Sequence, residues 1–105
     1  IKALQWHSYE VIELEKNNDV KILASSPTTK YQIFKYMDHA YGIQFHIEIK
    51  EDTVSQWSCV PEYEKALEDS LGKGALKIFD QNAKINMKSM NTSAEILYKN
   101  FKKII

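Results

Sequence analysis

Hydrophobic and polar residues alternate in short runs over the first half of the chain. Four β-branched or aromatic stretches are separated by polar turn signals such as Ser25-Ser26-Pro27. Such stretches at a spacing of about ten residues are typical of strands joined by hairpins or in a meander. We therefore expect strands at residues 11–14, 20–24, 31–36 and 41–49.

The apolar period becomes helical after Asp52. Pro61 and the acidic residues behind it are typical of a helix start, and Gly72 is typical of a helix end. A second apolar repeat predicts a helix over 75–88, and the capping-box pattern at 92–95 predicts the start of a third. The expected face of the 61–71 helix contains Tyr63, Ala66 and Leu67. The pattern predicts an α/β chain with about four short strands in residues 1–50, followed by about three helices in residues 51–105.

A chain of 105 residues is one small domain or a piece of a larger one. It begins with Ile1, inside an apolar stretch, rather than with Met. Strands that lack covering elements would expose a sheet face or edge. We therefore expect a partner surface, either upstream in the same polypeptide or in another chain.

The charge composition excludes several function classes. All 14 basic residues are Lys, and they balance 14 acidic ones. A neutral chain without Arg is a poor nucleic-acid binder, and its short apolar runs do not reach the roughly 20 residues of a membrane span. The single cysteine, Cys59, allows no intramolecular disulfide or thiolate cluster, and His7, His39 and His46 lack metal-ligand spacing. We expect a cytoplasmic protein with no metal and no cofactor.

The candidate chemistry lies in the stretch Tyr41–Ile49. Its apolar residues occupy the odd positions, so an extended backbone directs His46 and Glu48 to the opposite face. These two side chains would be about 7 Å apart along the strand, within reach of a hydrogen bond. A carboxylate against an imidazole is the base-and-orienter half of a nucleophilic triad. The same pattern is also typical of a solvated pair on a strand surface.

The sequence Gly42-Ile43-Gln44-Phe45-His46-Ile47-Glu48 resembles the Gly-Val-Gln-Phe-His-Pro-Glu motif of class I glutamine amidotransferases. In that family the His and Glu complete a Cys-His-Glu triad. Two further parts of the chain are similar to the family. One is residues 5–9, and the other is the pair of segments 23–26 and 31–34. Together with the motif, the similarity covers about residues 3–50. Within the family, the chain most resembles the stand-alone relatives of the GMP synthetase amidotransferase subunit.

The resemblance implies a fold and a set of roles. Residues 1–105 would be the C-terminal portion of a single three-layer, flavodoxin-like amidotransferase domain. His46 would be the general base and Glu48 its orienter, and His7, Ser8 and Tyr9 would help to seat the substrate. The substrate would be glutamine or another γ-glutamyl compound, with ammonia passed to an acceptor on a synthase partner.

Two departures from the family pattern change this expectation. The family nucleophile lies in a Gly-x-Cys-x-Gly elbow before the His, whereas Cys59 follows His46 and has no neighbouring Gly. We therefore expect the chain to be inactive alone and the nucleophile-bearing half to come from outside it. Ile47 replaces the Pro that restricts the backbone before the glutamate.

Three readings remain open at this point. The first is part of a glutamine amidotransferase or of a related γ-glutamyl peptide hydrolase. The second is a non-catalytic, degenerate amidotransferase-like interaction module. The third is an unrelated α/β protein in which the motif arose by chance.

Overall fold

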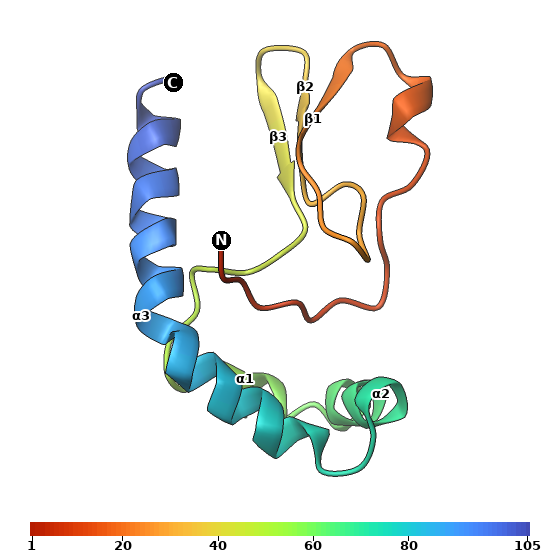
Figure 1. Ribbon diagram of the computed structural model, residues 1–105, viewed down its shortest axis with the longest axis vertical. Coiled ribbons are helices and arrows are strands. Elements are labelled where there is room, and N and C mark those ends of the chain that lie inside the picture. Colours follow the sequence, from red (N-terminus) through yellow and green to blue (C-terminus); the bar gives the residue numbers. More distant parts are fainter. The chain divides into compact units, whose positions relative to one another are not determined.

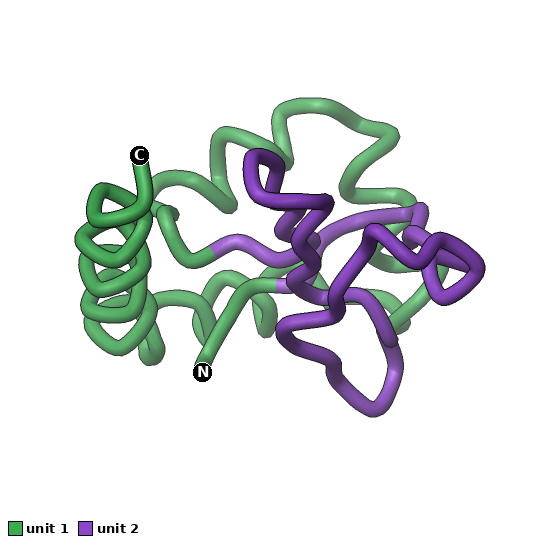
Figure 2. The backbone as a smooth tube through the Cα atoms, turned by 90° about the horizontal axis from the view of Figure 1, so that it is seen from above, with its two compact units in different colours: residues 1–4, 47–105 green, residues 5–46 purple.

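The computed structural model describes residues 1–105 as two compact units. Unit 1 contains residues 1–4 and 47–105, and unit 2 contains residues 5–46 (Figure 2). All the strands lie in unit 2 and all the α-helices in unit 1. The expected α/β order, strands first and helices afterwards, is confirmed.

Unit 2 is built on a three-stranded antiparallel sheet of order β1-β2-β3 (Figure 1). The strands are β1 (Val20–Ala24), β2 (Ile33–Tyr36) and β3 (Ala40–Ile43). Each strand follows its neighbour through a short connection, so the predicted meander is confirmed. The β2–β3 turn includes Met37 with φ 51° and is supported by an ion pair of 2.9 Å between Lys35 and Asp38.

One face of the β2–β3 pair depends on a glycine. Phe34 lies opposite Gly42 in the register, and its ring occupies the space that a Cβ at Gly42 would need. A Cβ there would be 2.8 Å from Phe34 Cε2, which is closer than real contacts of this kind. A side chain at the glycine of the Gly42–Glu48 motif would therefore require the Phe34 ring to move.

Two strand predictions need correction. The stretch 11–14 is not a strand, because Glu13 takes a left-handed conformation with φ 61° and the chain closes a 3-10 turn, η1 (Leu14–Lys16). Hydrogen bonds from Lys16 N to Glu13 O and from Asn17 N to Leu14 O hold that turn. The strand expected over 41–49 ends at Ile43, where the pairing with β2 stops.

Unit 1 contains three helices, α1 (Thr53–Trp57), α2 (Pro61–Leu71) and α3 (Ala75–Lys102). The predicted start of α2 at Pro61 and its end before Gly72 are confirmed. Gly72 and Gly74 have φ of 100° and 79°, a conformation that favours glycine, and they make the sharp connection to α3. The short helix α1 was not predicted.

The prediction of two helices over 75–105 is wrong, since α3 is one helix of 28 residues. Thr92 does not cap a new helix. Its hydroxyl donates to Lys88 O at 2.9 Å, one turn earlier in the same helix. This back-bonding satisfies the hydroxyl inside a helix and often bends it, and α3 changes direction near its middle (Figure 1).

The core of unit 1 lies beneath the first part of α3. Of the residues expected on the inner face of the 75–88 helix, Ala83 and Met87 are buried, whereas Leu76 and Phe79 are half-buried. Met90 is buried as well, as are Val54 of α1 and Leu67 of α2. Tyr63 was expected on the buried face of α2 but is 52% exposed, whereas Leu67 on the same helix is buried. Beyond Met90 no side chain of α3 is buried, and Ile96, Tyr98 and Phe101 are 55%, 63% and 43% exposed. None of these helices has the length and apolar content that crossing a bilayer requires.

Candidate functional site

Burial alternates along the segment that carries His46. The side chains of Phe45, Ile47 and Ile49 are only 8%, 4% and 3% exposed, whereas His46 is partly exposed and Glu48 is exposed. The predicted separation of apolar and polar side chains is therefore confirmed over 45–49, although regular strand pairing ends at Ile43. The apolar anchors hold the segment, and its polar side chains stay accessible.

His46 belongs to unit 2, where the segment is held by backbone hydrogen bonding. Gln44 N donates to Gln32 O at 2.9 Å, one residue beyond the last β2–β3 pair, Ile33 and Ile43. This bond extends the β-type pairing to Gln44, which is two residues before His46. The buried ring of Phe45 fixes the backbone immediately before the imidazole.

Glu48 belongs to unit 1, so the boundary between the units falls between the two predicted triad residues. Its carboxylate Oε2 accepts a hydrogen bond of 2.9 Å from Ile47 N. A proline at position 47 has no N–H and could not make this bond. The N–H of Ile47 thus supplies a direct restraint on the glutamate side chain.

His7, Ser8 and Tyr9 lie in unit 2, on an irregular segment before η1. His7 Nδ1 is 2.8 Å from Tyr9 O, so this nitrogen carries the donated proton. His7 Nε2 is 3.1 Å from the side chain of Gln5. The imidazole thereby folds the segment into a local turn, while Ser8 and Tyr9 stay exposed, Tyr9 to 89%. The structure brings His7 and Tyr9 together as one local unit.

Cys59 lies in a turn after α1 and is exposed. Its thiol is 3.5 Å from Ser55 O, one helical turn earlier. A nucleophile elbow needs a strained strand-to-helix turn with backbone N–H groups aimed at one point. The surroundings of Cys59 are those of a helix end. No group of three or more His, Cys, Asp or Glu side chains is arranged to hold a metal ion.

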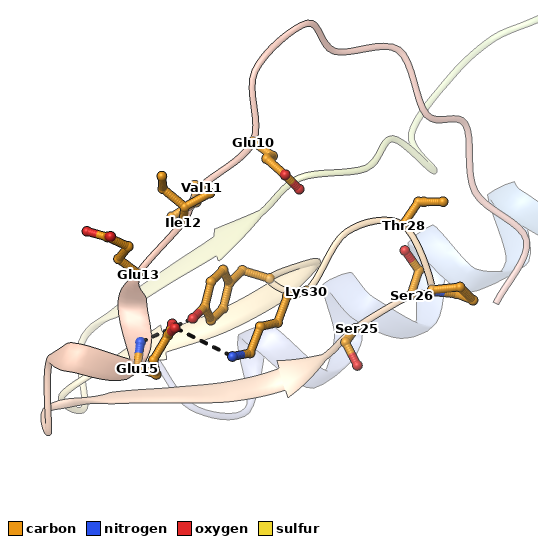
Figure 3. Close-up of a pocket in the computed structure, with 11 residues that line it drawn as sticks. Glu10, Val11, Ile12, Glu13, Glu15, Ser25, Ser26, Thr28 and Lys30 are labelled. Carbon is orange, nitrogen blue, oxygen red and sulfur yellow. Dashed lines mark hydrogen bonds and ion pairs between the residues drawn. The ribbon is translucent and has the colours of Figure 1, made fainter.

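A pocket in unit 2 was not predicted from the sequence. It has a volume of about 460 Å³ and lies between the 10–15 segment and the 25–31 segment (Figure 3). Glu15 anchors its wall, because Lys30 Nζ is 3.6 Å from the Glu15 carboxylate and Glu15 N donates to the Tyr31 hydroxyl. Glu10 and Glu13 add two further carboxylates to the lining, and Glu13 is paired with Lys16 at 3.0 Å. None of the five predicted site residues lines it.

The sequence signal for this pocket was the acidic run from Glu10 to Glu15. A run of this kind is more often a solvated surface, and nothing in its spacing shows that the Ser-Ser-Pro-Thr turn at 25–28 lies opposite it.

Comparison of the chain with protein-family models, with curated proteins and with solved structures found no match in any of the three.

Proposed function

We propose that this chain supplies the general base and its orienter to a Cys-His-Glu glutamine amidotransferase centre. The observation that carries the proposal is the seven-residue motif Gly42–Glu48. Its support from the structure is local. The Phe34 ring occupies the space beside Gly42, the apolar members of the segment are buried, and His46 and Glu48 keep accessible side chains.

The roles follow from the chemistry of the two side chains. His46 takes the proton from a cysteine thiol, and the thiolate attacks the γ-carbonyl carbon of glutamine. As the C–N bond breaks, the imidazolium returns the proton to the departing ammonia, leaving a γ-glutamyl thioester. His46 then deprotonates a water molecule that hydrolyses the thioester to glutamate, and the thiol is restored.

Glu48 orients the imidazole and stabilises its charged form. A carboxylate has two oxygens and about four acceptor positions, so the bond from Ile47 N to Oε2 leaves acceptor capacity for an imidazole N–H. In this proposal Ile47 does through a hydrogen bond what the family proline does through backbone restriction. The departure at position 47 is then compatible with a working glutamate.

The nucleophile in this proposal comes from outside residues 1–105, since Cys59 lies at a helix end. His7, Ser8 and Tyr9 contribute to the substrate seat, Ser8 and Tyr9 through backbone atoms. The layered, flavodoxin-like architecture and a cytoplasmic location belong to the same proposal. The ammonia acceptor is selected by a synthase partner, and a γ-glutamyl peptide presents the same carbonyl as glutamine.

A second candidate function is a non-catalytic interaction module. It is favoured by the apolar side chains that the sheet leaves accessible. Ile22, Leu23 and Ile43 are 39%, 46% and 44% exposed, and an uncovered sheet is a surface for pairing with another chain.

The two candidates are separated by a glutaminase assay. The isolated chain is incubated with glutamine, and glutamate release is measured for the wild type and for Cys59→Ser. The assay is repeated with the native assembly that contains the chain. The enzyme proposal predicts no turnover by the isolated chain and turnover by the assembly, unchanged by Cys59→Ser. The absence of turnover in the assembly would leave the module as the better account.

A further inference from the structure

Gln32 is a buried polar residue at the centre of unit 2. Its side chain is only 4% exposed, in a sheet whose strands contain no fully buried residue. Nε2 donates to Ser26 Oγ at 3.0 Å, and Gln32 N donates to Ala24 O at 3.1 Å. The residue therefore joins the end of β1 and the 25–29 loop to the start of β2.

Ser26 is itself held from the other side. Its hydroxyl accepts from Thr29 N at 3.1 Å, and its backbone N donates to Thr29 O at 2.9 Å. Thr29 is 6% exposed, so this loop is anchored inside the unit. The side-chain amide of Gln32 is thus fixed to a rigid support.

The backbone carbonyl of Gln32 faces the segment that carries the predicted base. It accepts the hydrogen bond from Gln44 N at 2.9 Å, two residues before His46. A continuous path of hydrogen bonds therefore leads from the Ser26 loop, through both ends of Gln32, to the backbone next to His46. Residues 5–46 contain every member of this path.

The side-chain amide of Gln32 is satisfied at only one of its two polar atoms. The Oε1 atom of Gln32 is buried and has no hydrogen-bond partner. A buried acceptor without a donor costs free energy, whereas an apolar side chain of the same shape avoids that cost. An apolar side chain could not make the bond from Nε2 to Ser26 Oγ, so the amide is explained by the loop to which it connects the start of β2.

We propose that Gln32 is a positioning residue for His46, acting through the Ser26 hydroxyl on one side and the Gln44 backbone on the other. The role rests on the proposed function of His46 as general base. The side-chain anchor restricts the Gln32 backbone, and this backbone restricts the segment 44–46. The imidazole then keeps one position while the substrate reacts.

The test uses the full chain and the substitution Gln32→Met, which keeps the length of the side chain and removes the amide. Amide hydrogen exchange is followed at Gln44, and the chemical shifts of the His46 ring are followed by nuclear magnetic resonance. The matched control is Gln56→Met, which removes an exposed side-chain bond of 2.6 Å to Asp52 in unit 1. The Met37 amide, bonded to Asp19 O in the same sheet, reports on the stability of unit 2.

We expect Gln32→Met to accelerate exchange at Gln44 by at least about tenfold while Met37 changes by less than about threefold. The chemical shifts of the His46 ring should change, and Gln56→Met should change neither the exchange at Gln44 nor the His46 ring. Ser26→Ala should reproduce the effect, and the double variant should exceed the larger single effect only slightly, because both remove one connection.

Equal acceleration at Gln44 and Met37 would show a purely structural role and overturn the proposal. Unchanged exchange at Gln44 in both Gln32→Met and Ser26→Ala would overturn it as well. These readouts do not depend on catalysis. A failure here is therefore distinct from a failure of the glutaminase proposal, which is tested by turnover in the native assembly.

Discussion

The contact between Gly42 and Phe34 makes a sharp prediction about the motif glycine. Substituting Gly42→Ala adds one methyl group at a point already occupied by the Phe34 ring, with Cε1 at 2.5 Å and Cε2 at 2.8 Å from the new Cβ. The backbone at Gly42 does not have a positive φ, so alanine is allowed there by conformation alone. The cost of the substitution therefore comes from the ring.

Two opposing contributions set the size of this cost. Moving a packed side chain out of the way of an inserted methyl typically costs about 1–3 kcal/mol. Replacing glycine by alanine in an extended strand returns about 0.5–1 kcal/mol through the reduced entropy of the unfolded chain. We expect Gly42→Ala to lower the free energy of unfolding of unit 2 by about 1–2 kcal/mol.

A double-mutant cycle with Phe34→Ala isolates the clash. Phe34 is half-buried, so its loss should cost about 2 kcal/mol, below the range for a fully buried Phe. In that background Gly42→Ala meets no ring and should be stabilising. Urea unfolding in a Trp57→Phe background leaves Trp6 of unit 2 as the only tryptophan reporter. If Gly42→Ala is as costly without the ring as with it, the clash is not the cause.

Three further predictions follow from other parts of the chain. Met90→Ala should lower the free energy of unfolding of unit 1 by about 2–5 kcal/mol in a denaturant titration, because Met90 is 2% exposed. An effect smaller than that of a substitution at an exposed position would contradict the packing described. The hydrogen bond from Lys35 lowers the pKa of Asp38, and the Lys35 charge is a second cause. The Asp38 carboxylate therefore stabilises the fold at pH values above its unfolded-state pKa. This stabilisation is lost as the pH falls through its folded-state pKa. Asp38→Asn should therefore be less stable than the wild type at about pH 7 and equal to it at about pH 2, and a difference that persists in acid would refute this. Ile47→Pro removes the donor to Glu48 Oε2, so the Glu48 carboxyl resonance should shift on substitution, and an unchanged resonance would show that this bond does not hold the side chain in solution.

The elements predicted best from the sequence are those whose ends carry local signals. Strand β1 follows directly from the apolar run between two polar turns, and its predicted limits match the structure. Helix α2 has Pro61 at its start and Gly72 at its end, and both act through backbone constraints that do not depend on the rest of the fold. Such signals can be read without knowing any tertiary contact.

The errors occur where a local signal competes with a longer-range one. Thr92 was interpreted as a helix cap, but the continuous apolar face through Met90 keeps the helix intact and the hydroxyl bonds to Lys88 O instead. Val11 and Ile12 have strand propensity, but no strand of the sheet pairs with them, and the conformation of Glu13 turns the chain.

The candidate site was predictable in part. The period of two over 45–49 correctly separated the buried Ile47 from the accessible His46 and Glu48. The bond from Ile47 N to Glu48 and the buried role of Gln32 could not be predicted, because both depend on backbone geometry after the strand has ended. The pocket beside Glu15 depends on two segments meeting, which no local pattern encodes.

Glutaminase turnover by the native assembly that contains this chain tests the central claim most directly. Glutamate release is measured for the wild type, His46→Asn and Glu48→Gln, with Cys59→Ser as the control that should retain full activity. Loss of the general base should lower kcat by at least about a hundredfold, and loss of the orienter should lower it by a smaller factor, with KM for glutamine nearly unchanged. Turnover that survives His46→Asn, or turnover by the isolated chain that disappears in Cys59→Ser, would contradict the assignment of His46 as the base acting on an external cysteine.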